Sequence, residues 1–134
     1  MYRSVATWTL LLSIAGCAIA PIAQDPQVSF VELMPNGSVA RELRFSLTQN
    51  PVETCISGDW REARPLNDHG RYTKRPAYVR EGDNLQVLLV NTVCDGYDSY
   101  VGKVTRGRFA GEHVQYGLGF SKSLGTVSGS LSVP

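Results

Sequence analysis

The chain has 134 residues, with 13 lysines and arginines against 12 aspartates and glutamates, and its formal net charge is +1. This length suits a single domain. The near balance of charge gives no electrostatic reason for binding to nucleic acid or to an anionic membrane surface. Composition therefore excludes the class of strongly basic nucleic-acid-binding proteins.

The first sixteen residues have the composition of an export signal. Arg3 is the only charged residue before Asp25, and a mostly apolar run occupies 5–16. This run is shorter than the roughly 20 residues that a membrane-spanning helix needs. A positive start, an apolar middle and small residues at the end are typical of a cleaved secretory signal peptide. We therefore predict a signal peptide over residues 1–16.

The sequence Ile14-Ala15-Gly16-Cys17 ends this segment. It resembles the lipobox of bacterial lipoproteins, in which a branched apolar residue and two small residues precede a cysteine, although isoleucine here replaces the commoner leucine. The resemblance implies that Cys17 receives a diacylglycerol and that signal peptidase II cuts before it. Two or three acyl chains hold a protein stably on a membrane, whereas one chain does so only marginally. The alternative is an ordinary signal peptide cut after 18–20.

The residues after Cys17 bear on location. Ala18 follows the cysteine. By resemblance to enterobacterial lipoprotein sorting, a residue other than aspartate there implies the outer membrane and a position facing the periplasm. Residues 17–27 contain two prolines and no hydrophobic period, which is typical of a tether. We therefore expect a bacterial cell-envelope lipoprotein with a lipidated tether at 17–27 and a folded domain at 28–134, in which we recognise no closer family.

From residue 28 onward the dominant pattern is the alternation of apolar and polar residues. Leu43, Phe45 and Leu47 share one face of a run at 42–47, and a similar alternation runs through 84–89. Such alternation is typical of half-buried antiparallel strands, and turn-forming residues separate the runs. The spacing predicts seven or eight strands, near 28–33, 39–48, 52–60, 77–80, 85–93, 99–105, 108–116 and 124–132.

Cys55 and Cys94 are the two cysteines that remain once Cys17 is assigned to the lipid. A pair of cysteines in an exported protein is most simply a disulfide. Neither has a histidine or another cysteine within five residues, which argues against a metal site. We expect the bridge to join the end of the third predicted strand to the end of the fifth.

The last third of the chain is rich in glycine. The stretches 107–111 and 125–129 share the form glycine–any–apolar–any–glycine, and we interpret them as strands of one meander. Glycines inside strands often mark bends and bulges, which the closure of a small sheet requires. The sequence therefore predicts an all-β fold, a small antiparallel β-barrel of seven or eight strands, with a β-sandwich as the alternative.

The longest stretch without a strand pattern is 61–76, and it is basic. Loops of this length usually have a function or are mobile, and binding residues often lie on loops held by a rigid scaffold. We interpret this one as a loop that binds an envelope protein or an anionic envelope component, the alternative being a solvated loop whose charges serve solubility. Its candidate contact residues are Arg61, Arg64, Arg71, Lys74 and Arg75.

Three aromatic residues are candidate ligand contacts at the mouth of the barrel: Trp60, Tyr97 and Tyr100. Exposed aromatic clusters serve recognition, although core packing is the favoured place for Trp60. Asp95 and Asp98 lie on either side of Tyr97 and could offer oxygens to calcium, but most ligands of a calcium-binding loop are missing. We therefore interpret this run as a turn in which Asp95 bonds nearby backbone amides.

Patterns of catalysis and metal binding are missing. His69 and His113 are the only histidines, and no H-x-x-x-H, H-E-x-x-H or G-x-S-x-G spacing occurs. An enzyme would require one of these histidines to meet an acid and a nucleophile in one cleft. The sequence therefore favours a non-catalytic domain without metal or cofactor, which binds or inhibits an envelope protein. The alternatives are a carrier of a small apolar ligand inside a lipocalin- or avidin-like barrel and, less favoured, an enzyme.

Overall fold

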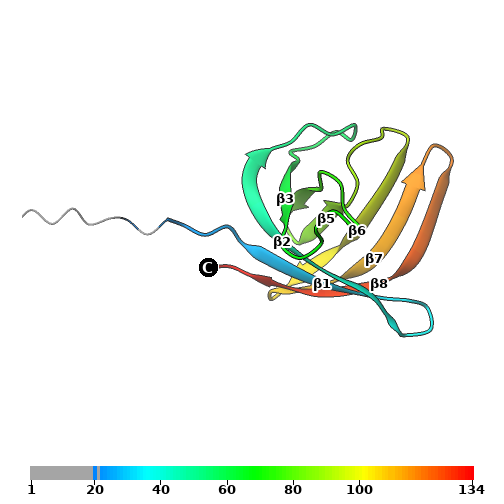
Figure 1. The fold of residues 1–134 in the computed structure, drawn as a ribbon, viewed down its shortest axis with the longest axis horizontal. Helices are drawn as coiled ribbons and strands as arrows, with labels where there is room; N and C mark the ends of the chain where they lie inside the picture. Colours follow the sequence, from blue (N-terminus) through cyan, green and yellow to red (C-terminus); the bar gives the residue numbers. More distant parts are fainter. Residues whose placement is uncertain (1–19, 21) are drawn as a thin grey trace, which may run out of the picture.

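The computed structural model describes residue 20 and residues 22–134. Its antiparallel strands follow one another around a barrel, which closes because the first strand pairs with the last as well as with the second. The start of the described chain and the C-terminus emerge on the same side of the barrel (Figure 1). The predicted all-β barrel is confirmed, and its closure excludes the sandwich alternative.

The described residues form eight strands, and each is hydrogen-bonded to its neighbours in sequence. The strands are β1 (Gln27–Leu33), β2 (Val39–Pro51), β3 (Arg61–Pro65), β4 (Ala77–Glu81), β5 (Asn84–Leu88), β6 (Gly96–Thr105), β7 (Arg108–Gly117) and β8 (Phe120–Ser132). Alternate side chains of each strand point into the barrel, because successive residues of a strand face opposite sides.

The prediction of a strand at 52–60 is wrong. This segment is a connection, which we call the outer strap, and it folds over the outer face of β4 and β5. Trp60 packs there against Ala77 and Leu88. The apolar residues of the strap therefore cover one face of a sheet from outside, whereas those of a strand would lie within the sheet.

The third strand lies instead at the start of the predicted basic loop. β3 contributes only Ala63 to the main core, beside Leu47 of β2. A short strand with a single buried apolar residue shows almost no alternation, so its sequence does not distinguish it from a loop.

A disulfide joins Cys55 to Cys94, as predicted, but at a different place in the fold. Cys55 lies in the outer strap, and Cys94 lies in the connection between β5 and β6, because β5 ends at Leu88. The bridge therefore attaches the strap to the barrel, and the expectation that it joins two strand ends is wrong.

Large side chains fill the barrel interior. Phe30 contacts Phe45, Tyr100 and Phe109 edge to face, with ring centroids 6.1, 5.2 and 4.9 Å apart. All four rings are buried. Such edge-to-face contacts stabilise a core beyond the burial of apolar area.

The two glycine-rich stretches lie side by side in β7 and β8, as predicted. Phe109 is opposite Gly129, and Gly111 is opposite Val127. On the other side of β7, Gly102 of β6 is opposite Gly111, and a Cβ atom on either glycine would lie 2.8 Å from the Phe109 ring. Glycine at these positions lets the phenylalanine lie against the inner wall of a strongly curved sheet.

Among residues 20 and 22–134, no helix is long and apolar enough to cross a bilayer. The predicted signal peptide and Cys17 lie outside the described residues. Export and lipidation therefore stay predictions from the sequence.

Candidate functional site

One buried acid organises the interior where β1 leaves the barrel. The Glu32 carboxylate accepts a hydrogen bond at Oε1 from Nδ1 of His113, at 2.7 Å. Its Oε2 accepts from the Tyr100 hydroxyl at 2.7 Å and pairs with Nε of Arg41 at 2.8 Å. The second ring nitrogen of His113 donates to the Asp98 carboxylate. We call these five residues the Glu32 network.

The charges of the Glu32 network balance. Burial lowers the pKa of His113, but the hydrogen bonds and charges of Asp98 and Glu32 outweigh burial and raise that pKa to about 9. Burial also opposes ionisation of Glu32, yet hydrogen bonds from His113 and Tyr100 hold its pKa below the ordinary value. At neutral pH the imidazolium and the Arg41 guanidinium therefore offset two carboxylates.

The network contains a histidine between two acids, but not in a cleft. His113 is 1% exposed, so a substrate does not reach its ring. Both ring nitrogens donate to carboxylates, so neither has a lone pair for general-base catalysis. His69, in contrast, is exposed on the connection after β3. In the described part of the chain, no group of three or more histidines, cysteines and acids has metal-site geometry.

β3 leads into residues 66–76, which we call the cationic loop, and Asp68 organises it. The buried Asp68 carboxylate accepts hydrogen bonds from the Tyr72 amide at 2.7 Å, the Thr73 amide at 2.9 Å and the Thr73 hydroxyl. Burial raises the pKa of Asp68, but these hydrogen bonds outweigh burial and hold the pKa below its ordinary value. A charged acceptor of this kind fixes the loop more firmly than a neutral one.

Further hydrogen bonds attach both ends of the cationic loop to the barrel. Asn67 accepts from the Arg44 amide at 2.8 Å and donates to the Glu42 carbonyl at 3.0 Å, which continues the pairing along β2. At the other end, the Lys74 amide donates to the Leu89 carbonyl at 2.9 Å. The loop is therefore part of the folded structure at both ends.

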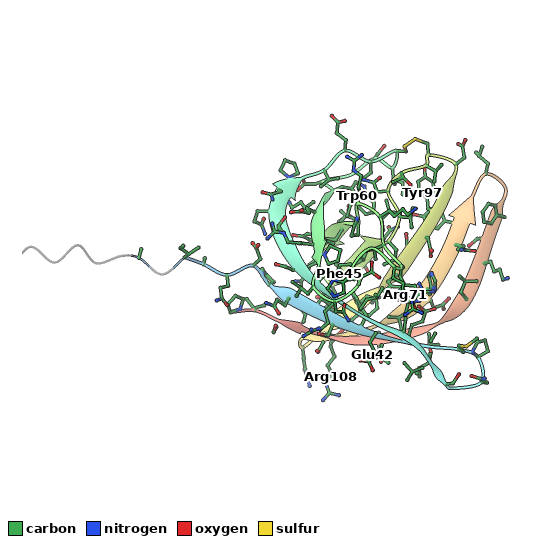
Figure 2. The ribbon with its side chains drawn as sticks, viewed as in Figure 1. Glu42, Phe45, Trp60, Arg71, Tyr97 and Arg108 are labelled. Carbon is green, nitrogen blue, oxygen red and sulfur yellow. A yellow bond between two sulfur atoms is a disulfide. The ribbon has the colours of Figure 1, made fainter. Side chains whose placement is uncertain are left out.

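Tyr72 connects the cationic loop to the Glu32 network. The guanidinium groups of Arg41 and Arg71 lie 4.8 and 5.0 Å from the centroid of its ring. Since Arg41 of β2 also pairs with Glu32, this arginine links the loop to the network. Figure 2 shows Arg71 on a different part of the barrel from Arg108, which begins β7.

The five predicted contact cations divide into two groups. Arg61 and Arg64 lie on β3 and pair with Asp59 at 2.9 Å and Glu62 at 3.2 Å. Placing these two arginines on a loop is therefore wrong. The other cations are exposed on the cationic loop, and within the described residues none has a carboxylate oxygen within 4.0 Å: Arg71, Lys74 and Arg75.

The backbone of the cationic loop contains two unusual conformations. His69 and Arg75 have φ angles of 51° and 50°, in the left-handed region that residues other than glycine rarely adopt. Such conformations persist where the surrounding structure dictates them, and they cluster at binding and catalytic sites. The hydrogen bonds of Asp68 and of the Lys74 amide are made by the residues that directly precede these two.

The three predicted mouth aromatics do not form a mouth. Tyr100 is fully buried in the core and bonded to Glu32, so its prediction as an accessible ligand contact is corrected. Trp60, the last residue of the outer strap, is buried against the outer face of the sheet, as core packing requires. Tyr97 is half-buried against Tyr116, with ring centroids 5.1 Å apart.

A groove of about 400 Å³ lies on the outer face, between the strap and β4–β6. Ile56 and Trp60 line it from the strap, and Val79, Gln86 and Val101 line it from the strands. A carrier of the predicted kind would hold its ligand inside the barrel instead, where aromatic rings fill the space.

The sequence prediction missed Glu32 and Arg41, although a signal for Glu32 was present. Val28, Phe30 and Glu32 alternate along one strand and share its buried face. An acid on an apolar face is expected to have buried partners. Nothing in the local sequence identifies those partners, because they come from distant strands.

Comparisons with known proteins give no relative for this chain. No protein-family model, no curated protein and no solved structure matches it. The functional conclusion rests on its own residues and their geometry.

Proposed function

We propose that this protein is a bacterial envelope lipoprotein, anchored through acyl chains on Cys17 in the outer membrane and facing the periplasm. We propose further that its barrel binds another envelope protein and catalyses no reaction. The lipobox supports the anchor, and the Cys55–Cys94 disulfide is compatible with an oxidising compartment outside the cytoplasm.

The cationic loop is the observation that carries the binding role. Its exposed cations lack carboxylate partners among the described residues, while Asp68 and Asn67 hold the backbone beneath them. A preorganised loop loses less conformational entropy on binding than a flexible one. Unpaired charges of one sign accelerate association with a surface of the opposite sign. These properties favour an acidic protein surface as the partner.

The state of the histidines supports a role without catalysis. A general base needs an accessible nitrogen lone pair, and both nitrogens of the buried His113 are already bonded to acids. The hydroxyl of Tyr100, which also belongs to the network, donates a hydrogen bond to Glu32 and is buried as well.

Capture from envelope extract tests the binding role. The tagged full-length protein is compared with two triple serine variants of equal charge loss. The loop variant changes Arg71, Lys74 and Arg75. The matched control changes the exposed cations of β6, β7 and the turn between them: Lys103, Arg106 and Arg108. We expect the native protein and the control, but not the loop variant, to retain the same partner at 0.15 M salt.

Two outcomes would contradict this proposal. Equal retention by both variants would show that the cationic loop does not contact the partner. Binding of the native protein to lipopolysaccharide vesicles, with no protein retained, would support an anionic envelope component as the ligand instead. Equal melting temperatures of the three proteins exclude misfolding as the cause of any loss.

The anchor has its own test. Cys17→Ser is expected to abolish incorporation of labelled palmitate, because the lipobox cysteine supplies the thiol that is acylated. The double variant Cys55→Ser, Cys94→Ser serves as the control and is expected to keep the label. Unchanged labelling of Cys17→Ser would refute the anchor.

A further inference from the structure

The hairpin between β1 and β2 projects from the barrel (Figure 1). Residues 34–40, which we call the projecting hairpin, are seven consecutive exposed residues without a charged side chain. Met34 and Val39 are apolar, yet they are 50% and 57% exposed. This uncharged projection stands next to a strongly charged loop, and neither the core nor the Glu32 network requires its side chains.

The tip of the projecting hairpin has a defined shape. The Met34 amide donates to the Ser38 carbonyl and the Gly37 amide to the Met34 carbonyl, both at 2.8 Å. The Asn36 side chain accepts from the Ser38 amide at 3.0 Å and from the Ser38 hydroxyl at 2.6 Å. Gly37 has a φ of 83°, which suits glycine in a tight turn.

The Glu32 network clamps the base of the projecting hairpin. Glu32 and Arg41 are directly opposite each other on β1 and β2, one on each arm, and they pair at 2.8 Å. Glu32 is also bonded to His113 of β7 at 2.7 Å. An ion pair and a buried hydrogen bond therefore hold both arms where they leave the barrel, and these contacts orient the hairpin.

The projecting hairpin and the cationic loop are neighbours. Arg41, at the base of the hairpin, contacts the ring of Tyr72 in the loop at 4.8 Å. Asn67 of the loop donates to the carbonyl of the next residue, Glu42. The part of the loop around Asn67 and Tyr72 therefore lies beside the base of the hairpin, and a partner that contacts this part meets the hairpin as well.

We propose that the projecting hairpin inserts into a concave apolar recess on the envelope protein that the cationic loop binds, and that acidic side chains border this recess. The inference rests on the proposed function and names the shape and chemistry of its partner. Met34 and Val39 fill the recess, since a few buried anchors supply most of the binding energy of an interface. The rigid base and tip reduce the entropy lost on insertion.

A protein recess is favoured over a lipid surface for two reasons. Under the proposed anchor, the acyl chains precede the start of β1, whereas the hairpin lies beyond its other end, at Leu33. The hairpin therefore lies at the end of β1 opposite to the end that leads to the proposed anchor. Membrane insertion also scales with buried apolar area, and the tip between the two exposed apolar residues is polar, with Asn36 and Ser38.

Photocrosslinking in intact membranes tests the insertion. A benzophenone amino acid replaces Met34 in the full-length protein, and in the control it replaces Ser128, which is exposed on β8. We expect the protein captured in the envelope experiment to crosslink from position 34 and not from position 128.

That protein is then purified, and its affinity for each variant is measured by a binding titration. Met34→Asp is expected to weaken binding about thirty-fold, and Ser128→Asp about two-fold at most.

The outcomes separate this inference from the proposed function. Loss of the partner in the cationic-loop variant, with native affinity in Met34→Asp and no crosslink from position 34, overturns the inference and leaves the proposed function standing. Crosslinking of position 34 to lipid overturns the inference in the same way. If the native protein captures no partner, both fall. If Met34→Asp melts at a lower temperature than the native protein, the affinity of Met34→Gln is measured as well, because glutamine is uncharged and similar in length to methionine.

Discussion

The outer strap and the cationic loop are the two long connections of the barrel, and they are ordered in opposite ways. The strap buries Trp60 against the outer face of the sheet and is attached by a disulfide. The cationic loop is held by the hydrogen bonds of Asp68 and by the contacts of Tyr72. Polar contacts can therefore order a loop while its cations stay exposed at the surface.

The two kinds of order also respond to different conditions. A disulfide acts mainly by restricting the unfolded chain, so its effect does not require charged groups. Hydrogen bonds to carboxylates and ion pairs depend on protonation. Chemical reduction should therefore release the strap, whereas a change of pH should act on the cationic loop and on the network beneath it.

The largest expected effect comes from removing the disulfide. The double variant Cys55→Ser, Cys94→Ser is expected to lose up to about 4 kcal/mol of unfolding free energy on the chain-entropy model, because the bridge spans a sequence separation of 39. Urea unfolding measures the loss. The native protein should lose the same amount in reductant, and the double variant should not respond. A native protein indifferent to reductant would contradict the bridge.

A smaller effect is expected from Asp68→Ala. The substitution leaves the amides of Tyr72 and Thr73 without their acceptor, which is expected to cost about 2 kcal/mol of unfolding free energy. Asp83→Ala, at an exposed aspartate beyond β4, is the control and should change stability by less than about 0.5 kcal/mol. Faster proteolysis within 66–76 should accompany the loss. Equal stability of the two variants would show that Asp68 does not order the loop.

The smallest effect is expected in the pH dependence of the unfolding free energy. The pKa of His113 is raised from 6.5 to about 9 by folding, so the folded protein holds a proton that the unfolded chain releases between these values. The contribution of His113 is complete below pH 6.5 and is lost as pH rises through 9, at about 1.4 kcal/mol per pH unit at most. Urea unfolding at pH 6.5, 7.5 and 8.5 measures this slope.

His69→Asn is the control for that measurement, because it removes the exposed histidine and leaves the Glu32 network intact. The control should keep the native slope, and a flat profile in the native protein would exclude a charged His113. On the acid side the sign reverses. The pKa of Glu32 is lowered in the folded protein, so its contribution is lost as pH falls through that lowered value.

Prediction from sequence succeeded where the signal is local. The alternation of Leu43, Phe45 and Leu47 along β2 indicates a strand whatever it pairs with, and glycine-containing turns separate the strands. Prediction failed for the outer strap, because Trp60 and its apolar neighbours indicate burial but not which face of a sheet they cover. β3 was missed because its one inward apolar residue, Ala63, gives no period.

The candidate site was predictable only in part. The cluster of cations at 61–76 is visible in the sequence, and so is Glu32 on the apolar face of β1. The partners of Glu32 are not visible, because Tyr100 and His113 are 68 and 81 residues away along the chain. Barrel closure brings these residues together, and no local pattern records that contact.

By itself, the sequence determined the fold class, the disulfide and the basic character of one segment, because alternation, cysteine pairing and charge are properties of composition and short-range order. Only the tertiary structure decided which cations pair with a carboxylate and which stay exposed without one. Arg61 and Arg71 are alike in the sequence. In the structure, however, Arg61 lies on a strand and pairs with Asp59, whereas Arg71 lies exposed on a loop. The physical reason is that a charge is neutralised by whatever the folded chain places within a few ångströms of it, and those neighbours are set by packing.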